Sequence, residues 1–251
     1  MNDCARSARR SHVLKSAVSV DAAREVVDDF AAFGIRAFTT TRSAGTYGTN
    51  GPEPVSEVME RWYALIDELR SLAPRFASAR QVHGTHVVVH SGEWEGWLRV
   101  ADADGHAAPE RGTAAAVSIA DCVPVFIAHP SGATALLHSG WRGTAARILD
   151  EGIAVLERRG FAASELRIHL GPSICGKCYE VSPDVYRQLT SKNASKPTPV
   201  DLRVLLADRA RSLAVRHITI SPCCTRCHNE RFFSHRAGDT GRQVAVIFAE
   251  R

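Results

Sequence analysis

The segment "ALLHSGWRGTAARIL" (135–149) joins an apolar strand, a glycine turn and the start of a helix. Its apolar run stops at His138, and Gly140 and Gly143 flank a Trp-Arg pair before helical spacing begins. Strand ends beside tight glycine turns and helix N-termini are places where ligands enter α/β proteins. The segment therefore predicts a mixed α/β fold and makes His138 a candidate functional residue.

Strands are also predicted on the N-terminal side of this segment. The stretches "VSIADCVPVFIAHP" (117–130) and "ATALLHSG" (133–140) are nearly continuous apolar runs joined by the turn "HPSG". Continuous apolar character indicates strands that are buried on both faces. We expect two neighbouring strands in the interior of a sheet.

The rest of the chain alternates between helical and strand patterns. Apolar spacing predicts helices over 56–73 with Ser56 as N-cap, over 143–160, from about residue 182, and over 201–215. Strands are predicted at 166–171 and 242–250, and 191–199 is predicted as a surface loop. Without an internal repeat or a long linker, the pattern predicts one α/β domain of mixed α+β type over 35–251. Its mixed β-sheets are flanked by helices, and an N-terminal extension covers 1–34.

Composition narrows the class of protein. The chain has 251 residues, 45% of them hydrophobic, and a formal net charge of +4 that comes from scattered arginines. Neither nucleic acid nor a membrane is specifically implied as a partner, and no apolar run approaches the roughly 18 residues of a membrane span. Seven cysteines, two of them adjacent, make a poor disulfide framework. We expect a cytoplasmic protein with reduced or metal-bound thiols; monomer and homodimer both stay open.

Three candidate metal ligands stand at predicted strand ends or breaks. His83 lies in "QVHG", Cys122 in "ADCVPV", and His138 ends the strand at 133–140. A lone histidine there is more often a core residue bonded to a backbone carbonyl. Two histidines and one thiolate, however, leave a fourth position open, which is typical of catalytic zinc.

Six motifs occur in the order and spacing of a known family: "TTTRSAGTYG", "RQVHGTHV", "SIADCVPVF", "LLHSGWRGT", "HLGPSICGKCYEV" and "FFSHRAGDTGR". From about residue 36 to 249 the chain resembles the YfiH family, also called the polyphenol oxidase or laccase-domain family. The resemblance implies a zinc ion held by His83, Cys122 and His138. It also implies adenosine deamination and phosphorolysis of adenosine, inosine and methylthioadenosine, with purine nucleosides and phosphate as partners. The stretch "GTYGTNGPEPV" (45–55) departs from the family pattern.

This chemistry requires further groups. Zinc with three protein ligands lowers the pKa of a bound water from about 15.7 toward about 7, which yields a nucleophile for adenine C6. Asp104 and Glu180 are the candidates for proton transfer, whereas strand alternation turns Asp121 toward a structural role.

Phosphate must be held beside the ribose, and forked arginine donors suit a dianion. Arg42, Arg142 and Arg236 each lie in a glycine-flanked turn of a quoted motif. We expect Arg42 and Arg236 to bind substrate or phosphate, and Arg142 alternatively to position its turn.

Two other enzyme classes would use some of the same residues. A laccase needs about ten ligands for four coppers, mostly from His-X-His pairs, and the sequence has no such pair. Weak oxidase activity after copper loading would then be adventitious. Cys122 and His138 can alternatively form the dyad of a cysteine hydrolase, which would have no use for His83.

The remaining cysteines form a CxxC…CxxC pattern at Cys175, Cys178, Cys224 and Cys227. In a small intracellular module this pattern indicates structural zinc, although here the separation is longer than in a zinc ribbon. Small packed thiols are the alternative.

Overall fold

The computed structural model describes residues 20–21 and 23–251. Most of the predicted N-terminal extension over 1–34 thus lies outside the described residues. Its last part is described: β2 (Arg24–Val26) pairs with β3 (Ile35–Thr40), and the short helix η1 (Asp28–Phe33) lies between them in the chain. The domain boundary itself stays a prediction.

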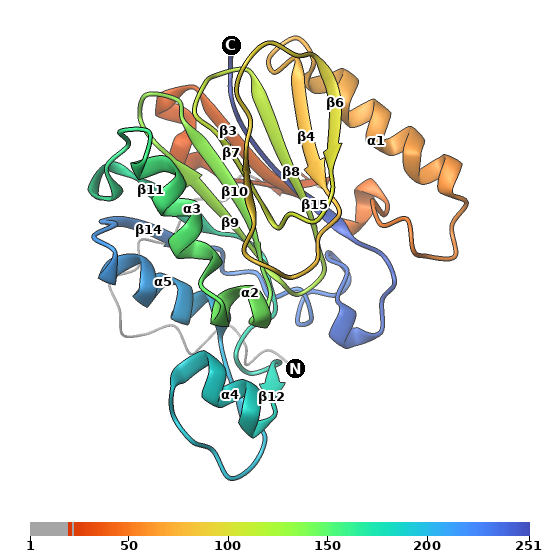
Figure 1. The fold of residues 1–251 in the computed structure, drawn as a ribbon. Coiled ribbons are helices and arrows are strands. Elements are labelled where there is room, and N and C mark those ends of the chain that lie inside the picture. The colour runs from red at the N-terminus through yellow and green to blue at the C-terminus, as the bar shows by residue number, and fades with distance from the viewer. Residues whose placement is uncertain (1–19, 22) are drawn as a thin grey trace.

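Two large β-sheets lie face to face between helices (Figure 1). The first sheet has the strand order β1-β2-β3-β15-β8-β4-β6 and the second the order β14-β11-β9-β10-β7-β5. Strands of the first sheet are β1 (Val20–Asp21), β2 (Arg24–Val26), β3 (Ile35–Thr40), β15 (Gln243–Ala249), β8 (Thr113–Ile119), β4 (Arg75–Ala79) and β6 (Gly96–Val100). Strands of the second are β14 (His217–Ile220), β11 (Arg167–Leu170), β9 (Val123–Ala128), β10 (Thr134–Ser139), β7 (Gly105–Ala108) and β5 (Val87–Val89).

Helices cover the outer faces of both sheets. Helix α1 (Val55–Leu69) packs on the first sheet, and α3 (Ile148–Glu157) and α5 (Leu202–Ser212) pack on the second. The other helices are α2 (Trp141–Ala145), α4 (Pro183–Thr190), η2 (Arg42–Ala44), η3 (Ala163–Glu165) and η4 (His235–Ala237). A small ladder joins β12 (Glu180–Val181) to β13 (Thr198–Pro199). The result is the mixed α/β fold that the sequence predicts.

Side-chain alternation explains the continuous apolar runs. In β10, Leu136 faces the core between the two sheets, whereas its neighbour Leu137 packs beneath α3 and α5. Successive side chains of a strand point to opposite faces, so a strand with a sheet on one side and helices on the other needs apolar residues throughout. Every residue of β9 and β10 is buried, which confirms the prediction made for this pair.

Two predicted elements are interrupted. The run over 117–130 is divided between β8 in one sheet and β9 in the other, and Asp121 between them adopts a left-handed φ of 82°. The helix predicted over 143–160 is two helices, because Arg147 has φ 68° between α2 and α3. A left-handed residue ends regular hydrogen bonding, and because such a φ is uncommon at any residue other than glycine, the apolar pattern does not predict it here.

Helix boundaries otherwise follow the sequence closely. Helix α1 begins at Val55 with Pro54 as its N-cap, so Ser56 is inside the first turn and the N-cap expected there is wrong. Ser182 does cap α4, since its side chain accepts from the Val185 amide at 3.4 Å. Part of the predicted surface loop at 191–199 forms β13.

Candidate metal centre

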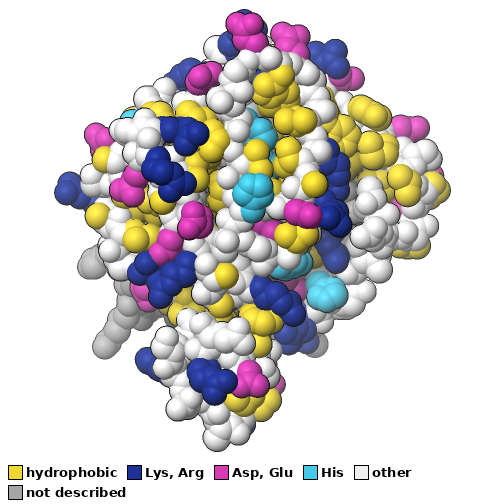
Figure 2. Space-filling view, in the orientation of Figure 1, with side chains coloured by type: hydrophobic (Ala, Val, Ile, Leu, Met, Phe, Trp, Pro, Cys, Tyr) yellow, Lys and Arg dark blue, Asp and Glu magenta, His cyan; other side chains and the backbone are white. Residues whose placement is uncertain are grey.

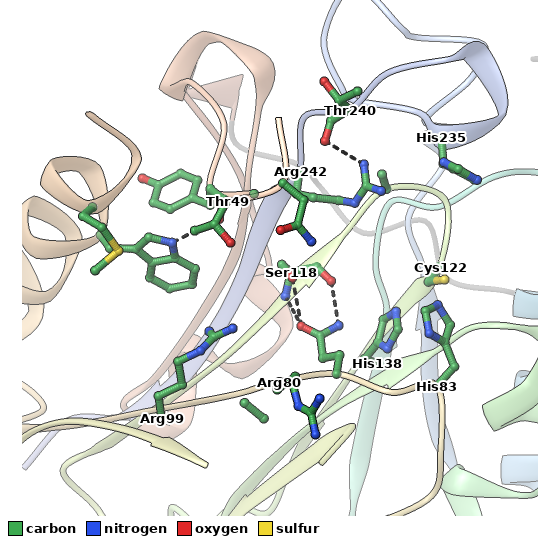
Figure 3. A pocket seen from close by; sticks show the side chains of 18 of the residues that line it. Thr49, Arg80, His83, Arg99, Ser118, Cys122, His138, His235, Thr240 and Arg242 are labelled. Atoms are coloured by element: carbon green, nitrogen blue, oxygen red, sulfur yellow. Dashed lines mark hydrogen bonds between the residues drawn. The ribbon is translucent and has the colours of Figure 1, made fainter. Parts of the chain in front are cut away.

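His83, Cys122 and His138 meet where β9 and β10 leave the second sheet. His138 lies within β10, Cys122 directly precedes β9, and His83 comes from the segment between β4 and β5. One possible ligand atom from each residue lies within 4.8 Å of the others. Figure 3 shows both imidazole rings next to the Cys122 sulfur. The three ligands predicted from the sequence are thus brought together.

The carboxylate of Asp104 positions both histidines by hydrogen bonds. It is fully buried; its Oδ1 accepts from the His83 amide at 2.9 Å and from His138 Nδ1 at 2.8 Å. Its Oδ2 accepts from the amides of Val82 at 3.1 Å and Gly84 at 2.7 Å. Burial raises the pKa of this carboxyl, but these hydrogen bonds lower it further, so the group is a carboxylate. Because Nδ1 of His138 donates to Asp104, Nε2 is the ring nitrogen that can coordinate a metal.

Gly140 leaves room for the cluster. A Cβ at this position would lie 2.9 Å from Cys122 Sγ and 3.1 Å from His83 Cδ2. Both distances are shorter than a side chain tolerates against atoms that are fixed in place. The glycine turn after His138 therefore lets the backbone approach the ligands closely.

Electrostatics favour a charged thiolate at the cluster. Burial raises the pKa of the Cys122 thiol, but the charge of His138 and hydrogen bonds from both histidines lower it to about 6. Burial lowers the pKa of His138, whereas the charges and hydrogen bonds of Cys122 and Asp104 raise it to about 9. Thiolate is the form in which cysteine binds metal and the form in which it attacks electrophiles. The donor set fits zinc: two imidazoles and one thiolate, with a buried carboxylate orienting one imidazole.

A cavity of about 570 Å³ opens beside the cluster, and His83, Cys122 and His138 form part of its wall. This volume lies in the usual range for small-molecule sites. Arg80, Arg99 and Arg242 also line the cavity. In Figure 2, Lys and Arg side chains lie beside His side chains near the right centre of the visible face. The cavity therefore combines a metal-type cluster with positive charge.

The cavity lining also contains aromatic side chains and a further histidine. Trp62 and Trp97 are both in this lining, and they stack with ring centroids 5.4 Å apart and planes at 22°. His235, from η4, also lines the cavity, and Figure 3 shows it above Cys122. His235 and the three lining arginines are not among the candidates predicted from the sequence. Arg80, Arg242 and His235 all lie in quoted motifs, so their positions in those motifs were the available signal.

The three arginine candidates for substrate or phosphate binding, Arg42, Arg142 and Arg236, are not among the residues that line the cavity. Arg42 donates to the carbonyls of Asn229 and Phe232 and to Asp239 Oδ2, at 2.9, 3.1 and 2.7 Å. Arg142 stacks on its neighbour Trp141, with its guanidinium 4.3 Å from the ring centroid.

Arg236 and the carboxylates near it hold loops together. The Arg236 side chain donates to the Glu180 carbonyl at 3.2 Å, and its amide donates to Asp121 Oδ2 at 2.7 Å. Asp121 Oδ1 accepts from Thr225 Oγ1 at 2.6 Å. Asp121 thus has the structural contacts expected of it, while Glu180 is exposed and not among the cavity residues.

Comparisons with known proteins agree with this geometry. A family model described as "Multi-copper polyphenol oxidoreductase laccase" matches residues 37–250. A purine nucleoside phosphorylase of Deinococcus radiodurans is 34% identical over 84% of this chain and 87% of its own. Adenosine deaminase RL5, from an unknown prokaryotic organism, is 30% identical over 86% of this chain and 94% of its own. The crystal structure of YlmD from Geobacillus stearothermophilus superposes with a TM-score of 0.85, at 25% identity, over 94% of this chain and 100% of its own.

The motifs, the fold and the relatives thus agree, and the chain belongs to the YfiH family, the laccase-like family that this model describes.

Proposed function

We propose that the protein is a zinc-dependent purine nucleoside enzyme. It would phosphorolyse adenosine, inosine and S-methyl-5'-thioadenosine and deaminate adenosine. One observation carries the proposal: the cluster of His83, Cys122 and His138 forms part of the wall of a cavity large enough for a nucleoside. The purine nucleoside phosphorylases and the adenosine deaminase among the relatives support the same class of substrate.

The ligand set favours zinc over a copper cluster. When bound, zinc would supply Lewis acidity and a neutral-pH nucleophile from water. Among residues 20–21 and 23–251, the groups that can hold a metal are this cluster and a set of four cysteines. Neither resembles the ten or so mainly histidine ligands of a four-copper oxidase. A polyphenol oxidase is therefore the weaker reading, despite the description of the family model.

Positive charge in the cavity supports phosphate binding. Arg80 forms an ion pair with Asp102, and Arg242 donates to the carbonyls of Thr240 and Gly241 at 3.0 and 2.7 Å. Arg99 has no ion-pair partner within the described part of the chain. A guanidinium with unused donors is suited to bind a dianion. We therefore assign phosphate to this arginine group, with Arg99 as its principal donor.

Proton transfer requires a titratable group that reaches the substrate. Asp104 already accepts four hydrogen bonds and is fully buried, so we assign it as a positioning residue. His235 is exposed and lines the same cavity as the three cluster residues (Figure 3). Histidine is the commonest general acid or base in enzymes. We assign the proton transfer at the purine to His235.

Incubating the zinc-loaded protein with adenosine, with and without phosphate, tests the proposal. Separation of the products should reveal inosine in both mixtures, and adenine with ribose 1-phosphate only when phosphate is present. Inosine and phosphate should give hypoxanthine. If neither nucleoside is consumed, the proposed function is wrong, even when the metal is bound.

A cysteine hydrolase is the second candidate. The lowered pKa of Cys122 and the raised pKa of His138, which follow from their charges and hydrogen bonds after opposing burial effects, favour a thiolate-imidazolium pair. Such an enzyme survives chelators and is inactivated by alkylation. A zinc enzyme loses activity with its metal and regains it when zinc is added.

The same chemistry bears on location. We propose that the protein works in the cytoplasm, where thiols such as Cys122 stay reduced. Among the described residues, none of the helices is long and apolar enough to cross a membrane.

A further inference from the structure

Four cysteines outside the cavity converge from two loops. Cys175 and Cys178 follow β11, and Cys224 and Cys227 follow β14. These two strands are neighbours and run parallel, so their loops leave the same edge of the sheet. The four sulfur atoms lie within 4.8 Å of one another. The two CxxC sequences are thus brought together across about 50 residues of chain, as their pattern permits.

The sulfur spacing fits a metal better than a disulfide. Sγ of Cys178 lies 3.5 Å from Sγ of Cys227, whereas a disulfide needs about 2.05 Å. Four sulfurs in a tetrahedron at about 2.3 Å from zinc are about 3.8 Å apart. The amides of Cys175 and Cys227 also point at Cys224 Sγ, at 3.2 and 3.4 Å. Such N–H donors stabilise a thiolate ligand.

Cations accompany both CxxC sequences at the same position. Lys177 precedes the second cysteine of one, and Arg226 precedes the second cysteine of the other. Arg226 also donates to the Cys178 carbonyl at 3.3 Å, which connects the two loops. Four thiolates around Zn²⁺ carry two net negative charges. Two adjacent cations offset that charge.

Packing alone does not account for this cluster. Its buried members are Ile174, Cys175 and Cys224, while Cys178 is half-buried and Cys227 is exposed. So small an apolar group stabilises a pair of loops weakly. The segment 221–242 has η4 as its regular structure, yet it carries His235 to the cavity. A cross-link at the four cysteines would fix this long segment.

We propose that Cys175, Cys178, Cys224 and Cys227 bind a structural zinc ion. The ion would displace four protons from the thiols and hold four sulfurs in a closed tetrahedron. It would also fix the loop that contacts Asp121. Thr225, which lies between two of the ligands, donates to Asp121, the residue before Cys122. This site is independent of the proposed nucleoside chemistry.

Zinc counting on the purified, reduced protein tests this site. Native mass spectrometry and elemental analysis should find two zinc ions per wild-type chain. Cys227→Ser should retain one, and the matched control Cys223→Ser, whose thiol is outside the cluster, should retain two. His83→Gln should lose the other ion and keep this one. Failure of the catalytic proposal is thereby distinguishable from failure of this one.

Cobalt substitution gives a second readout that does not depend on activity. The intense thiolate-to-cobalt bands of a four-sulfur site should appear in wild type, His83→Gln and Cys223→Ser, and disappear in Cys227→Ser. A wild-type chain with one zinc ion, unchanged by Cys227→Ser, would overturn the proposal. So would a mass two hydrogens lower with no second zinc, which would indicate a Cys178–Cys227 disulfide.

Discussion

The two sulfur-containing clusters of this protein differ in ligand number and in access. The cluster of His83, Cys122 and His138 offers three ligands and borders a cavity of about 570 Å³. The cluster of Cys175, Cys178, Cys224 and Cys227 offers four and is not among the cavity residues. Catalytic zinc keeps a position open, and structural zinc is closed by protein ligands. Ligand count and access together assign chemistry to the first cluster and cross-linking to the second.

The hydrogen bonds that support the two clusters also differ. Asp104 fixes the imidazole of His138 and the backbone of His83. The three-ligand cluster, called the open cluster below, therefore depends on one buried carboxylate. The four-cysteine cluster, called the closed cluster below, is supported instead by backbone amides that donate to Cys224 Sγ. A charged residue thus orients the ligands where geometry must be exact enough for reaction, and backbone suffices where only a cross-link is needed.

Loss of a ligand from the open cluster should have the largest effect. His83→Gln should lower kcat/KM for both deamination and phosphorolysis by about a thousandfold or more, because several kcal/mol of Lewis-acid stabilisation would be lost. Steady-state assays with adenosine and inosine measure this. His86→Gln is the matched control, since His86 is exposed and its Nδ1 donates to the Asp102 carbonyl outside the cluster.

Retention of activity by His83→Gln would favour the dyad of Cys122 and His138, because a cysteine hydrolase does not need His83. The open cluster would then not act as a catalytic zinc site, and the contrast with the closed cluster would be lost.

Removal of the supporting charge should have the next largest effect. In Asp104→Asn, the amide NH₂ would face the N–H groups of Val82 and Gly84, or would face His138 instead. We expect zinc affinity at the open cluster to fall about 10- to 100-fold. Competition with a chelator measures the affinity, and Asp208→Asn, on the exposed face of α5, serves as control. Unchanged affinity would mean that the ligands hold their geometry without this carboxylate.

Cavity arginines should affect phosphate more than they affect the nucleoside. Arg99→Ala should raise the apparent KM for phosphate about tenfold, the worth of one charge-assisted hydrogen bond of about 1.5 kcal/mol, and leave deamination nearly unchanged. Arg142→Ala, which removes a guanidinium stacked on Trp141 outside the cavity, is the control. Equal losses in both reactions would contradict the assignment of phosphate to Arg99.

The closed cluster should affect stability and hardly affect rate. Cys227→Ser should lower Tm by several degrees, since about 1 kcal/mol corresponds to roughly 2 to 4 °C in a chain of this size. Its kcat for adenosine should change by less than about threefold. Differential scanning calorimetry beside Cys223→Ser measures the first quantity. A large fall in kcat at unchanged Tm would mean that this cluster takes part in the reaction.

Sequence patterns predict the fold class well because the strands are buried on both faces. The continuous apolar runs of β9 and β10 leave little ambiguity, and helix spacing is regular. The breaks at Asp121 and Arg147 are not predictable in this way, because a left-handed φ at such residues is imposed by tertiary contacts. For Asp121, those contacts are made by Thr225 and Arg236, which are distant in sequence.

The site residues likewise fall into those that local motifs predict and those that depend on tertiary contacts. The ligands were predictable because each belongs to a motif at a strand end or break. The role of Asp104 was not, since its four hydrogen bonds depend on a loop and a strand that the sequence does not place side by side. Glycine-flanked turns likewise drew attention to Arg42 and Arg236, whose partners are protein carbonyls and carboxylates.

Zinc content of His138→Gln in a Cys227→Ser background tests the central claim most directly. Cys227→Ser removes the closed site, so any remaining zinc reports on the open cluster alone. Elemental analysis of folded protein should find one zinc ion per chain in Cys227→Ser and close to none in the double variant, with both nucleoside reactions lost. One full equivalent retained in the double variant would contradict the account and make His138 a core residue.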